Sequence, residues 1–365
     1  MRGLRSRHLL PLALCVGSIA MVGCPKMPRV SALDPTPTAS ASTSATPSAS
    51  PSPTPSPSAT PADMPTRRVL LAGAAPRGIA VDASGNGFVT LADDVVQLSM
   101  AVGDFTAVAT ASLKSDTRTF TSPAGIVLLG SGTVAWFTDG TQLRAYTPAQ
   151  DTVDDFPFGG APSRLAVDAQ NNLWFTDAGS PRIGAIPAGS PLGTTPLALS
   201  LTAMPVDLLV DVTGTGWALC SQGGAVRIAK ISRTLSGSTL TDLELDFDLA
   251  VTGLSQAAGI AIDPAGGIWI TGATAGGLGQ LIKLDRESGS PVTVIDLDFV
   301  PGRLALRGDF AWVADATSLK KISLSTHALV DTQLLGGKAA EVFKDAEQDL
   351  WIPVSNSNTV IKLDF

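Results

Sequence analysis

The chain has 365 residues, of which 44% are apolar and only 16% are charged, and its formal net charge is −7. This length allows two domains or one large repetitive domain, and the acidic balance argues against nucleic acid as a partner, which requires a basic face. Two histidines and three cysteines are too few for a histidine-based metal site or a disulfide framework, so we expect no metal and no other cofactor.

The first 23 residues predict a secretory signal that ends at a lipidation site. Three arginines precede an apolar run, Leu9–Gly23, which is too short to span a bilayer comfortably. The run ends in Met-Val-Gly-Cys, which resembles the lipobox of bacterial lipoproteins with Met in place of the usual Leu. The resemblance implies that residues 1–23 are removed and that Cys24 is acylated; the alternative is an ordinary signal with a chance cysteine.

Acylation of Cys24 would tie the chain to a membrane without a transmembrane helix, because each buried CH₂ contributes roughly 0.8 kcal/mol. We therefore expect a lipid-anchored protein of the bacterial cell envelope, at the outer membrane and either periplasmic or exposed at the surface. Cys15 leaves with the signal and Cys24 is taken by lipid. Cys220 then remains alone, and no intramolecular disulfide is expected.

Residues 24–65 predict a linker of low sequence complexity. Its central part, Pro35–Ala62, contains only Pro, Thr, Ala and Ser, and it has no large apolar side chain to offset the entropy of ordering. An extended polyproline-like chain rises about 3.1 Å per residue, which sets the reach at roughly 80–90 Å. We interpret the segment as a passive tether, whose composition also permits O-glycosylation.

Residues 66–365 contain a unit that repeats seven times. Each unit places an aliphatic residue 8 to 10 residues before an aromatic residue, and successive aromatic residues are 38 to 52 residues apart. All six tryptophans of the protein stand in this single register, which chance does not explain. The seven aromatic residues are Phe88, Trp136, Trp174, Trp217, Trp269, Trp312 and Trp351.

Within each unit, the pattern predicts four short strands. A β-branched or aliphatic strand leads through a tight turn, often Asp-x-x-Gly, to the aromatic strand, and a third and a more variable fourth strand follow. Four short strands per repeat are typical of a β-propeller. Lys338–Gln348 looks locally helical, but its place in the repeat predicts a strand and a turn.

The seventh unit ends at Phe365 after its third strand, so its fourth strand must come from elsewhere. Thr66–Ala72 precedes the first unit without three strands of its own, and we expect it to supply that strand. Such closure removes the exposed edges of an open stack of sheets. The predicted fold class is therefore an all-β, seven-bladed propeller, closed by an N-terminal strand and monomeric.

Ala161–Asp177 reads APSRLAVDAQNNLWFTD and resembles the repeat of virginiamycin B lyase (streptogramin lyase) and of related NHL-type propellers. The resemblance covers Thr66–Phe365 and implies a carbon–oxygen lyase that uses a histidine pair, a glutamate and a magnesium ion near the channel. The mature chain holds one histidine, His327, on the opposite face, and no residue matches that catalytic set. Gluconolactonase-like propellers bind a metal through inward Glu, Asn and Asp, and Glu341 alone does not reproduce that arrangement.

The candidate site lies on the face where the chain enters each first strand and turns from the second strand to the third. The repeat register places seven charged side chains there: Arg164, Asp207, Arg303, Glu341, Asp139, Asp177 and Asp315. One interpretation is a polar mouth that recognises a small charged ligand or a protein loop. The other is inter-blade ion pairing and turn capping, in which Arg164 pairs with Asp207 and Arg303 with Glu341 on neighbouring blades.

Other chemically notable residues have structural interpretations. The aromatic row forms the core between blades, and Cys220 is a small buried strand residue with no evident base beside it. His327 is interpreted as an exposed loop residue. Four turn aspartates cap their turns rather than bind calcium, namely Asp82, Asp168, Asp211 and Asp263.

These observations favour a membrane-anchored lipoprotein whose propeller is a binding or scaffold module for an unknown protein or small-molecule ligand. The alternative is a streptogramin lyase-like or lactonase-like enzyme, which the missing histidines disfavour. A third interpretation, a structural part of a cell-surface assembly, would use the flank or the opposite face. Mg²⁺-dependent loss of a streptogramin B substrate separates the enzyme from the other two.

We expect the substitution Cys24→Ser to abolish palmitate labelling and to release the protein from membranes, because the acyl chains are its predicted anchor. Metabolic labelling followed by membrane fractionation measures both effects. A Cys24→Ser protein that stays labelled and membrane-bound would show that the predicted lipidation site is wrong.

Overall fold

The computed structural model describes residues 65–71, 75–82, 87–99, 108–191 and 193–365. The predicted signal peptide, residues 1–23, and all of the predicted linker except Pro65 lie outside the described residues. The described part contains 28 strands and one short 3₁₀ helix, η2 (Gly130–Gly132). No helix in this part is long and apolar enough to cross a membrane.

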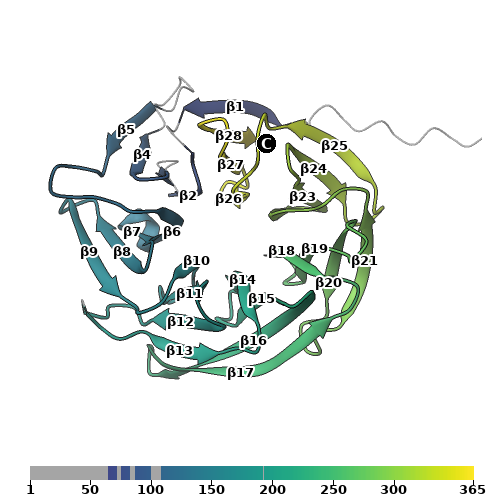
Figure 1. Ribbon diagram of the computed structural model, residues 1–365, viewed down its shortest axis with the longest axis horizontal. Coiled ribbons are helices and arrows are strands. Elements are labelled where there is room, and N and C mark those ends of the chain that lie inside the picture. Colours follow the sequence, from purple (N-terminus) through teal and green to yellow (C-terminus); the bar gives the residue numbers. More distant parts are fainter. Residues whose placement is uncertain (1–64, 72–74, 83–86, 100–107, 192) are drawn as a thin grey trace, which may run out of the picture. The chain divides into compact units, whose positions relative to one another are not determined.

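The strands form seven four-stranded antiparallel blades arranged as a ring (Figure 1), which confirms the predicted fold class. In each blade the first strand lies nearest the ring centre and the fourth lies at the rim. Blade one comprises β2 (Gly78–Val81), β3 (Gly87–Thr90), β4 (Val95–Ser99) and β5 (Val108–Ser112). Blade two comprises β6 (Pro123–Leu129), β7 (Val134–Asp139), β8 (Gln142–Thr147) and β9 (Thr152–Pro157).

The remaining blades follow in chain order. Blade three comprises β10 (Pro162–Val167), β11 (Leu173–Asp177), β12 (Arg182–Ile186) and β13 (Leu197–Ser200). Blade four comprises β14 (Met204–Val210), β15 (Gly216–Gln222), β16 (Ala225–Ser236) and β17 (Thr239–Val251). Blade five comprises β18 (Gln256–Ile262), β19 (Ile268–Ala273), β20 (Gly279–Leu284) and β21 (Pro291–Leu297). Blade six comprises β22 (Leu304–Arg307), β23 (Phe310–Ala314), β24 (Ser318–Ser323) and β25 (Leu329–Leu334).

Blade seven takes its outer strand from the start of the domain, as predicted. Three of its strands come from the end of the chain, and the fourth comes from the start of the propeller. They are β26 (Phe343–Lys344), β27 (Leu350–Val354), β28 (Thr359–Asp364) and β1 (Thr66–Leu71). β1 pairs antiparallel with β28 over its whole length, and Arg68 forms an ion pair with Asp364 across the two strands. A parallel pairing of Leu71 with Val108 joins β1 to the rim of blade one.

The row of aromatic residues forms the core between blades, as predicted. Each ring on a second strand packs against the next blade, in seven separate clusters. Trp174 of blade three, for example, is fully buried against Leu208 and Ala218 of blade four. Trp351 of blade seven packs against Ile79 of blade one, so the same contact closes the ring. Truncating a buried tryptophan to alanine typically costs about 3–5 kcal/mol.

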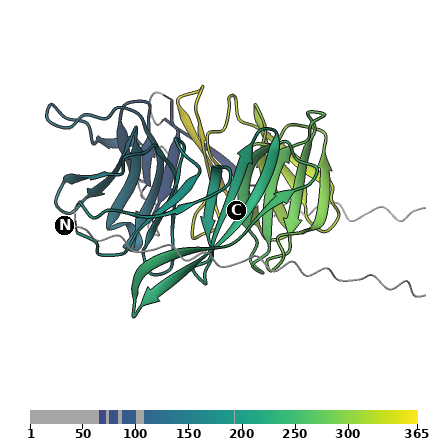
Figure 2. The same cartoon turned by 60° about the horizontal axis from the view of Figure 1, so that its bottom comes forward.

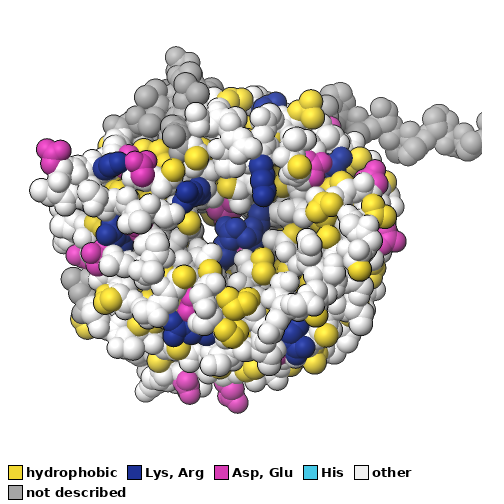
Figure 3. Space-filling model, viewed as in Figure 1, with side chains coloured by type: hydrophobic (Ala, Val, Ile, Leu, Met, Phe, Trp, Pro, Cys, Tyr) yellow, Lys and Arg dark blue, Asp and Glu magenta, His cyan; other side chains and the backbone are white. Residues whose placement is uncertain are grey.

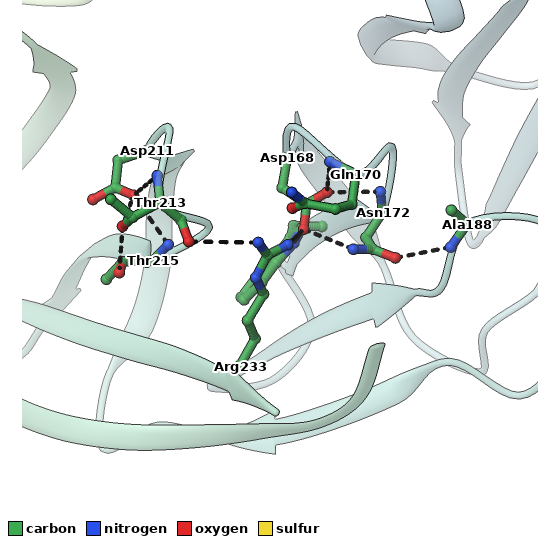
Figure 4. Close-up of polar contacts among 9 residues, drawn as sticks. Asp168, Gln170, Asn172, Ala188, Asp211, Thr213, Thr215 and Arg233 are labelled. Carbon is green, nitrogen blue, oxygen red and sulfur yellow. Dashed lines mark hydrogen bonds and ion pairs between the residues drawn. The ribbon is translucent and has the colours of Figure 1, made fainter. Parts of the chain in front are cut away.

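An aspartate six residues before the tryptophan holds the turn between the first two strands of a blade (Figure 4). Asp168 Oδ1 accepts hydrogen bonds from the backbone N–H groups of Gln170 and Asn172, and its Oδ2 accepts one from Trp174 Nε1. The same pair of contacts, to a turn N–H and to the indole, is made by Asp211, Asp263 and Asp345. The predicted turn caps at Asp168, Asp211 and Asp263 are therefore confirmed, and Asp345 joins them; the turn after Asp82 lies outside the described residues.

Basic side chains from the next blade reach two of these carboxylates. Arg233 on β16 pairs with Asp168 of blade three, and Arg286 after β20 pairs with Asp211 of blade four. Both carboxylates are buried, so the arginine charge offsets the cost of their desolvation. These contacts link neighbouring blades on the face opposite the first-strand entries, a role that the repeat register did not predict.

Two blades depart from the regular repeat. β16 and β17 have 12 and 13 residues and form a long hairpin that extends beyond the ring (Figure 2). This insertion explains why Trp217 and Trp269 are 52 residues apart. In blade seven, the segment Lys338–Gln348 contains the two-residue strand β26 and a turn rather than a helix, as predicted.

Removing residues up to Pro65 should leave the stability of the propeller unchanged, because no propeller strand is lost. Removing residues up to Gly73 deletes β1 and exposes the backbone edge of β28, so we expect aggregation or a large loss of cooperativity. Urea unfolding of the two truncations measures the difference, with the shorter deletion as the control. Equal midpoints and slopes for both proteins would contradict the role of β1.

Candidate functional site

The entries of the first strands surround a cavity at the centre of the ring. Its volume is about 120 Å³, and its charged lining comes from blades three, four, six and seven, as Arg164, Asp207, Arg303 and Glu341. The structure thus brings together four of the seven predicted site residues. A group of Lys and Arg side chains stands at the centre of the ring in the space-filling view (Figure 3).

Arg303 and Asp207 form an ion pair, with 2.5 Å between Nη1 and Oδ2. The predicted pairing of neighbouring blades, Arg164 with Asp207 and Arg303 with Glu341, is therefore wrong, since this pair joins blade six to blade four. Blade five presents Gly259 at the equivalent position, so no side chain separates the two partners. Asp207 Oδ2 also accepts a hydrogen bond from a backbone N–H of blade five, at 3.1 Å.

Arg164 is the cation of this cavity that has no carboxylate partner of its own. Its backbone N–H donates to Thr176 Oγ1, whereas its guanidinium makes no ion pair or hydrogen bond with the described residues. Burial and the nearby charge of Arg303 lower the pKa of Arg164, while Glu341 and Asp207 act in the opposite direction. Because an arginine side chain stays protonated at neutral pH, it presents a fixed positive charge to the cavity.

Glu341 faces the two arginines from blade seven. Burial raises the pKa of Glu341, although the charges of Arg164 and Arg303 act to lower it. The backbone N–H of Ile79 donates to the carboxylate, but Oε2 is buried without a hydrogen-bond partner in the described structure. A carboxyl group in this setting can gain a proton, and the neutral form adds a hydrogen-bond donor to the cavity.

A wider hollow of about 390 Å³ adjoins the cavity and shares two of its residues. Its basic lining consists of Arg164, Arg303 and Lys338. We call the two spaces together the channel mouth, which carries three cations and two carboxylates. Sequence reasoning missed Lys338 because only two positions of each repeat were considered, one at the first strand and one after the second strand, and Lys338 stands three residues before Glu341.

The other three predicted residues, Asp139, Asp177 and Asp315, make contacts near their own blades. Each carboxylate stands at or directly after the end of a second strand, and accepts hydrogen bonds from backbone N–H groups of nearby loops. Each also pairs with a basic side chain five positions later, as Asp139–Arg144 at 3.0 Å, Asp177–Arg182 at 2.6 Å and Asp315–Lys320 at 3.7 Å. None of the three lines the channel mouth. Their geometry is that of turn caps.

Asp177 illustrates how fully such a cap uses its carboxylate. Burial alone would raise the pKa of Asp177, but hydrogen bonds from Ser180 Oγ, Ala161 N and Arg182 lower it to about 2. The carboxylate therefore stays ionised at neutral pH. Its stabilising contribution is present above the pKa of an unfolded aspartate and is lost as the pH falls toward 2.

The remaining reactive residues lie away from the channel mouth. Cys220 on β15 is fully buried, and burial raises its pKa to about 12, which suppresses the thiolate that a nucleophile needs. His327 lies in the exposed turn between β24 and β25, on the opposite face, as predicted. Among the described residues, no group of three His, Cys, Asp or Glu side chains is placed to hold a metal ion.

Comparisons with known proteins identify the fold. No protein-family model matches the chain, and no curated protein matches it in sequence. Virginiamycin B lyase from Staphylococcus aureus matches with 16% identity and a TM-score of 0.61, over 82% of this chain and 99% of that chain. A catalytically inactive histidine-to-alanine form of that lyase, with quinupristin, matches with 15% identity and a TM-score of 0.65 over the same shares, 82% and 99%.

Hydrazine synthase from Kuenenia stuttgartiensis also matches, with 11% identity and a TM-score of 0.64, over 85% of this chain and 98% of that chain. Identities this low establish a common fold. They confirm the virginiamycin B lyase-like propeller that the repeats predicted.

We expect Arg303→Ala and Asp207→Ala each to destabilise the propeller, by at most about 3–5 kcal/mol, because each leaves a partly buried charge without its partner. The double variant should cost clearly less than the sum of the two. Urea unfolding of all four proteins measures the coupling. The exposed pair Lys114–Asp93 is the control, and its coupling should be much smaller, because solvent screens an exposed ion pair. Additive effects at Arg303 and Asp207 would rule out the structural ion pair.

Proposed function

We propose that the chain is a lipid-anchored, extracytoplasmic binding protein whose propeller captures a small ligand with an anionic group at the channel mouth. The observation that carries this proposal is the guanidinium of Arg164. It lines the cavity without a carboxylate partner, while Arg303 is already paired with Asp207. A planar guanidinium with free N–H groups is suited to bidentate recognition of a carboxylate or a phosphate.

The charge of the channel mouth supports an anion rather than a cation. Three cations and two carboxylates leave a net charge of 3 − 2 = +1. Because burial raises the pKa of Glu341, protonation there would increase the net charge to +2. A ligand anion would pair with Arg164 and Lys338, and the Arg303–Asp207 pair would remain intact. The small central cavity suits one acidic group, and the wider hollow suits the rest of a small molecule or the tip of a protein loop.

The predicted lipidation site and linker indicate where in the cell the channel mouth would lie. Acylation at Cys24 would hold the chain in the bacterial cell envelope, and the linker of residues 24–65 would keep the propeller away from the membrane. Closure by β1 leaves each blade with four strands, which supports a monomeric propeller. The proposed partners are thus the membrane, through the lipid, and one anionic ligand or protein loop.

The second candidate function is a lyase-like activity. The fold shared with virginiamycin B lyase from Staphylococcus aureus favours it. Against it, the histidine of the propeller, His327, lies on the face opposite the channel mouth. Arginines that remain protonated at neutral pH also make poor general bases. We therefore rank binding above catalysis.

Arg164→Gln should weaken anion binding at least tenfold while the protein stays folded, because the amide lacks the charge and the bidentate geometry. Thermal shifts of the mature chain carrying Cys24→Ser, titrated with citrate, phosphate and sulfate, measure apparent affinity, since a ligand of the native state raises its stability. Arg67→Gln on the exposed side of β1 is the control with the same charge change. Absence of any shift, or equal shifts in all three proteins, would contradict the proposal.

A further inference from the structure

The blades differ in what lies opposite their central tryptophan. In blades four to seven, the residue paired with the tryptophan on the third strand is a lysine, in the pairs Trp217–Lys230, Trp269–Lys283, Trp312–Lys321 and Trp351–Lys362. The four ammonium groups lie 5.8, 5.4, 5.6 and 5.1 Å from the centroids of the rings. Each blade therefore stacks an ammonium group of its own on its tryptophan, which is a cation–π contact.

Blade two has the surroundings of such a contact without the cation. Trp136 pairs with Ala145 on β8, and Ala145 pairs with Asp154 on β9. Blade six has Trp312, Lys321 and Asp331 at the same three positions. Blade two thus keeps an aromatic ring and a carboxylate on one side of the sheet, and an alanine stands where the ammonium-bearing side chain would be.

Among the described residues, no cation of a neighbouring blade takes the place of the missing lysine. Blade three also has an alanine opposite its tryptophan, Ala185, but Arg233 of the next blade reaches its turn and pairs with Asp168. In blade two, the turn position six residues before Trp136 is Gly130, so the capping carboxylate is absent as well. The carboxylate of Asp154 makes no ion pair or hydrogen bond with the described residues.

A cavity of about 400 Å³ occupies this place, between blades two and three. Trp136, Ala145 and Asp154 all line it. The rest of the lining is largely apolar and includes Leu129, Val134, Phe156, Leu173, Ile186 and Pro187. The loops around it are the first-to-second and third-to-fourth strand connections, so the cavity opens on the face opposite the channel mouth. Its size is in the range of small-molecule sites.

We propose that this cavity binds an organic ammonium ion that carries an apolar group. The ammonium takes the place that lysine holds in blades four to seven, beside Trp136 and the half-buried carboxylate of Asp154, and the apolar group lies against the aliphatic lining. A metal ion would require several oxygen ligands in place of this one carboxylate. The same chemistry is offered by a free alkylamine and by a lysine side chain of a peptide.

Calorimetric titration of the mature chain carrying Cys24→Ser with hexylammonium tests the proposal, with hexanol as the neutral probe of equal length. We expect hexylammonium to bind at least tenfold more tightly than hexanol. Asp154→Asn should remove most of that preference. Asp155→Asn is the matched control, because it lies next in sequence, faces the other side of the sheet and pairs with Arg144; it should leave binding unchanged.

Ala145→Lys provides an independent test, because it rebuilds the arrangement of blade six and should abolish hexylammonium binding. A peptide with one internal lysine, compared with its Nε-acetylated form, distinguishes the two sources of the cation. Binding of the free amine, with or without binding of the peptide, supports the site. Equal affinity for hexylammonium and hexanol, or an Asp154→Asn protein that binds like the parent, would overturn the proposal. These outcomes are independent of anion binding at Arg164.

Discussion

One aromatic ring per blade, packed against the next blade, is the contact on which the rest of the structure depends. A four-stranded sheet of this size cannot bury its faces alone, so each blade is stable only between two neighbours. The seven rings make seven such contacts, and Trp351 against Ile79 completes the circle. Because the last blade borrows β1, the closing contact and the backbone closure lie in the same place. The ring therefore depends on residues that are nearly 300 positions apart.

The geometry of the ring decides which charged side chains are used in structural contacts and which can contact a ligand. Aspartates in turns and loops are covered by backbone N–H groups and by a nearby basic side chain, as at Asp168 and Asp177. The residues at the starts of the first strands converge on one axis, so their charged side chains face each other rather than a loop. Glycine at blade five leaves Arg303 free to reach Asp207, and Arg164 remains without a partner. The distinctive chemistry of the channel mouth follows from this convergence.

Because the blades are repeats, each position in one blade can be compared with the equivalent position in the others. Four blades stack a lysine on their tryptophan, and a fifth receives an arginine at its turn from the next blade. Against that pattern, the alanine opposite Trp136 and the cavity beside it stand out. The channel mouth thus has an excess of positive charge, whereas the cavity on the other face has an aromatic ring beside a carboxylate.

The sequence by itself determined the architecture, because propeller strands recur with a fixed local period, each repeat carries its own aromatic residue, and five of the seven repeats have an aspartate six residues before it. It also placed Arg164, Asp207, Arg303 and Glu341 on one face, since register alone decides the face. Only the tertiary structure decided which of them pair, because the partners of Arg303 depend on the width of the channel and on the glycine of blade five. The sequence pattern does not show how far a side chain reaches across the axis of the ring, and it does not show a cavity between two blades.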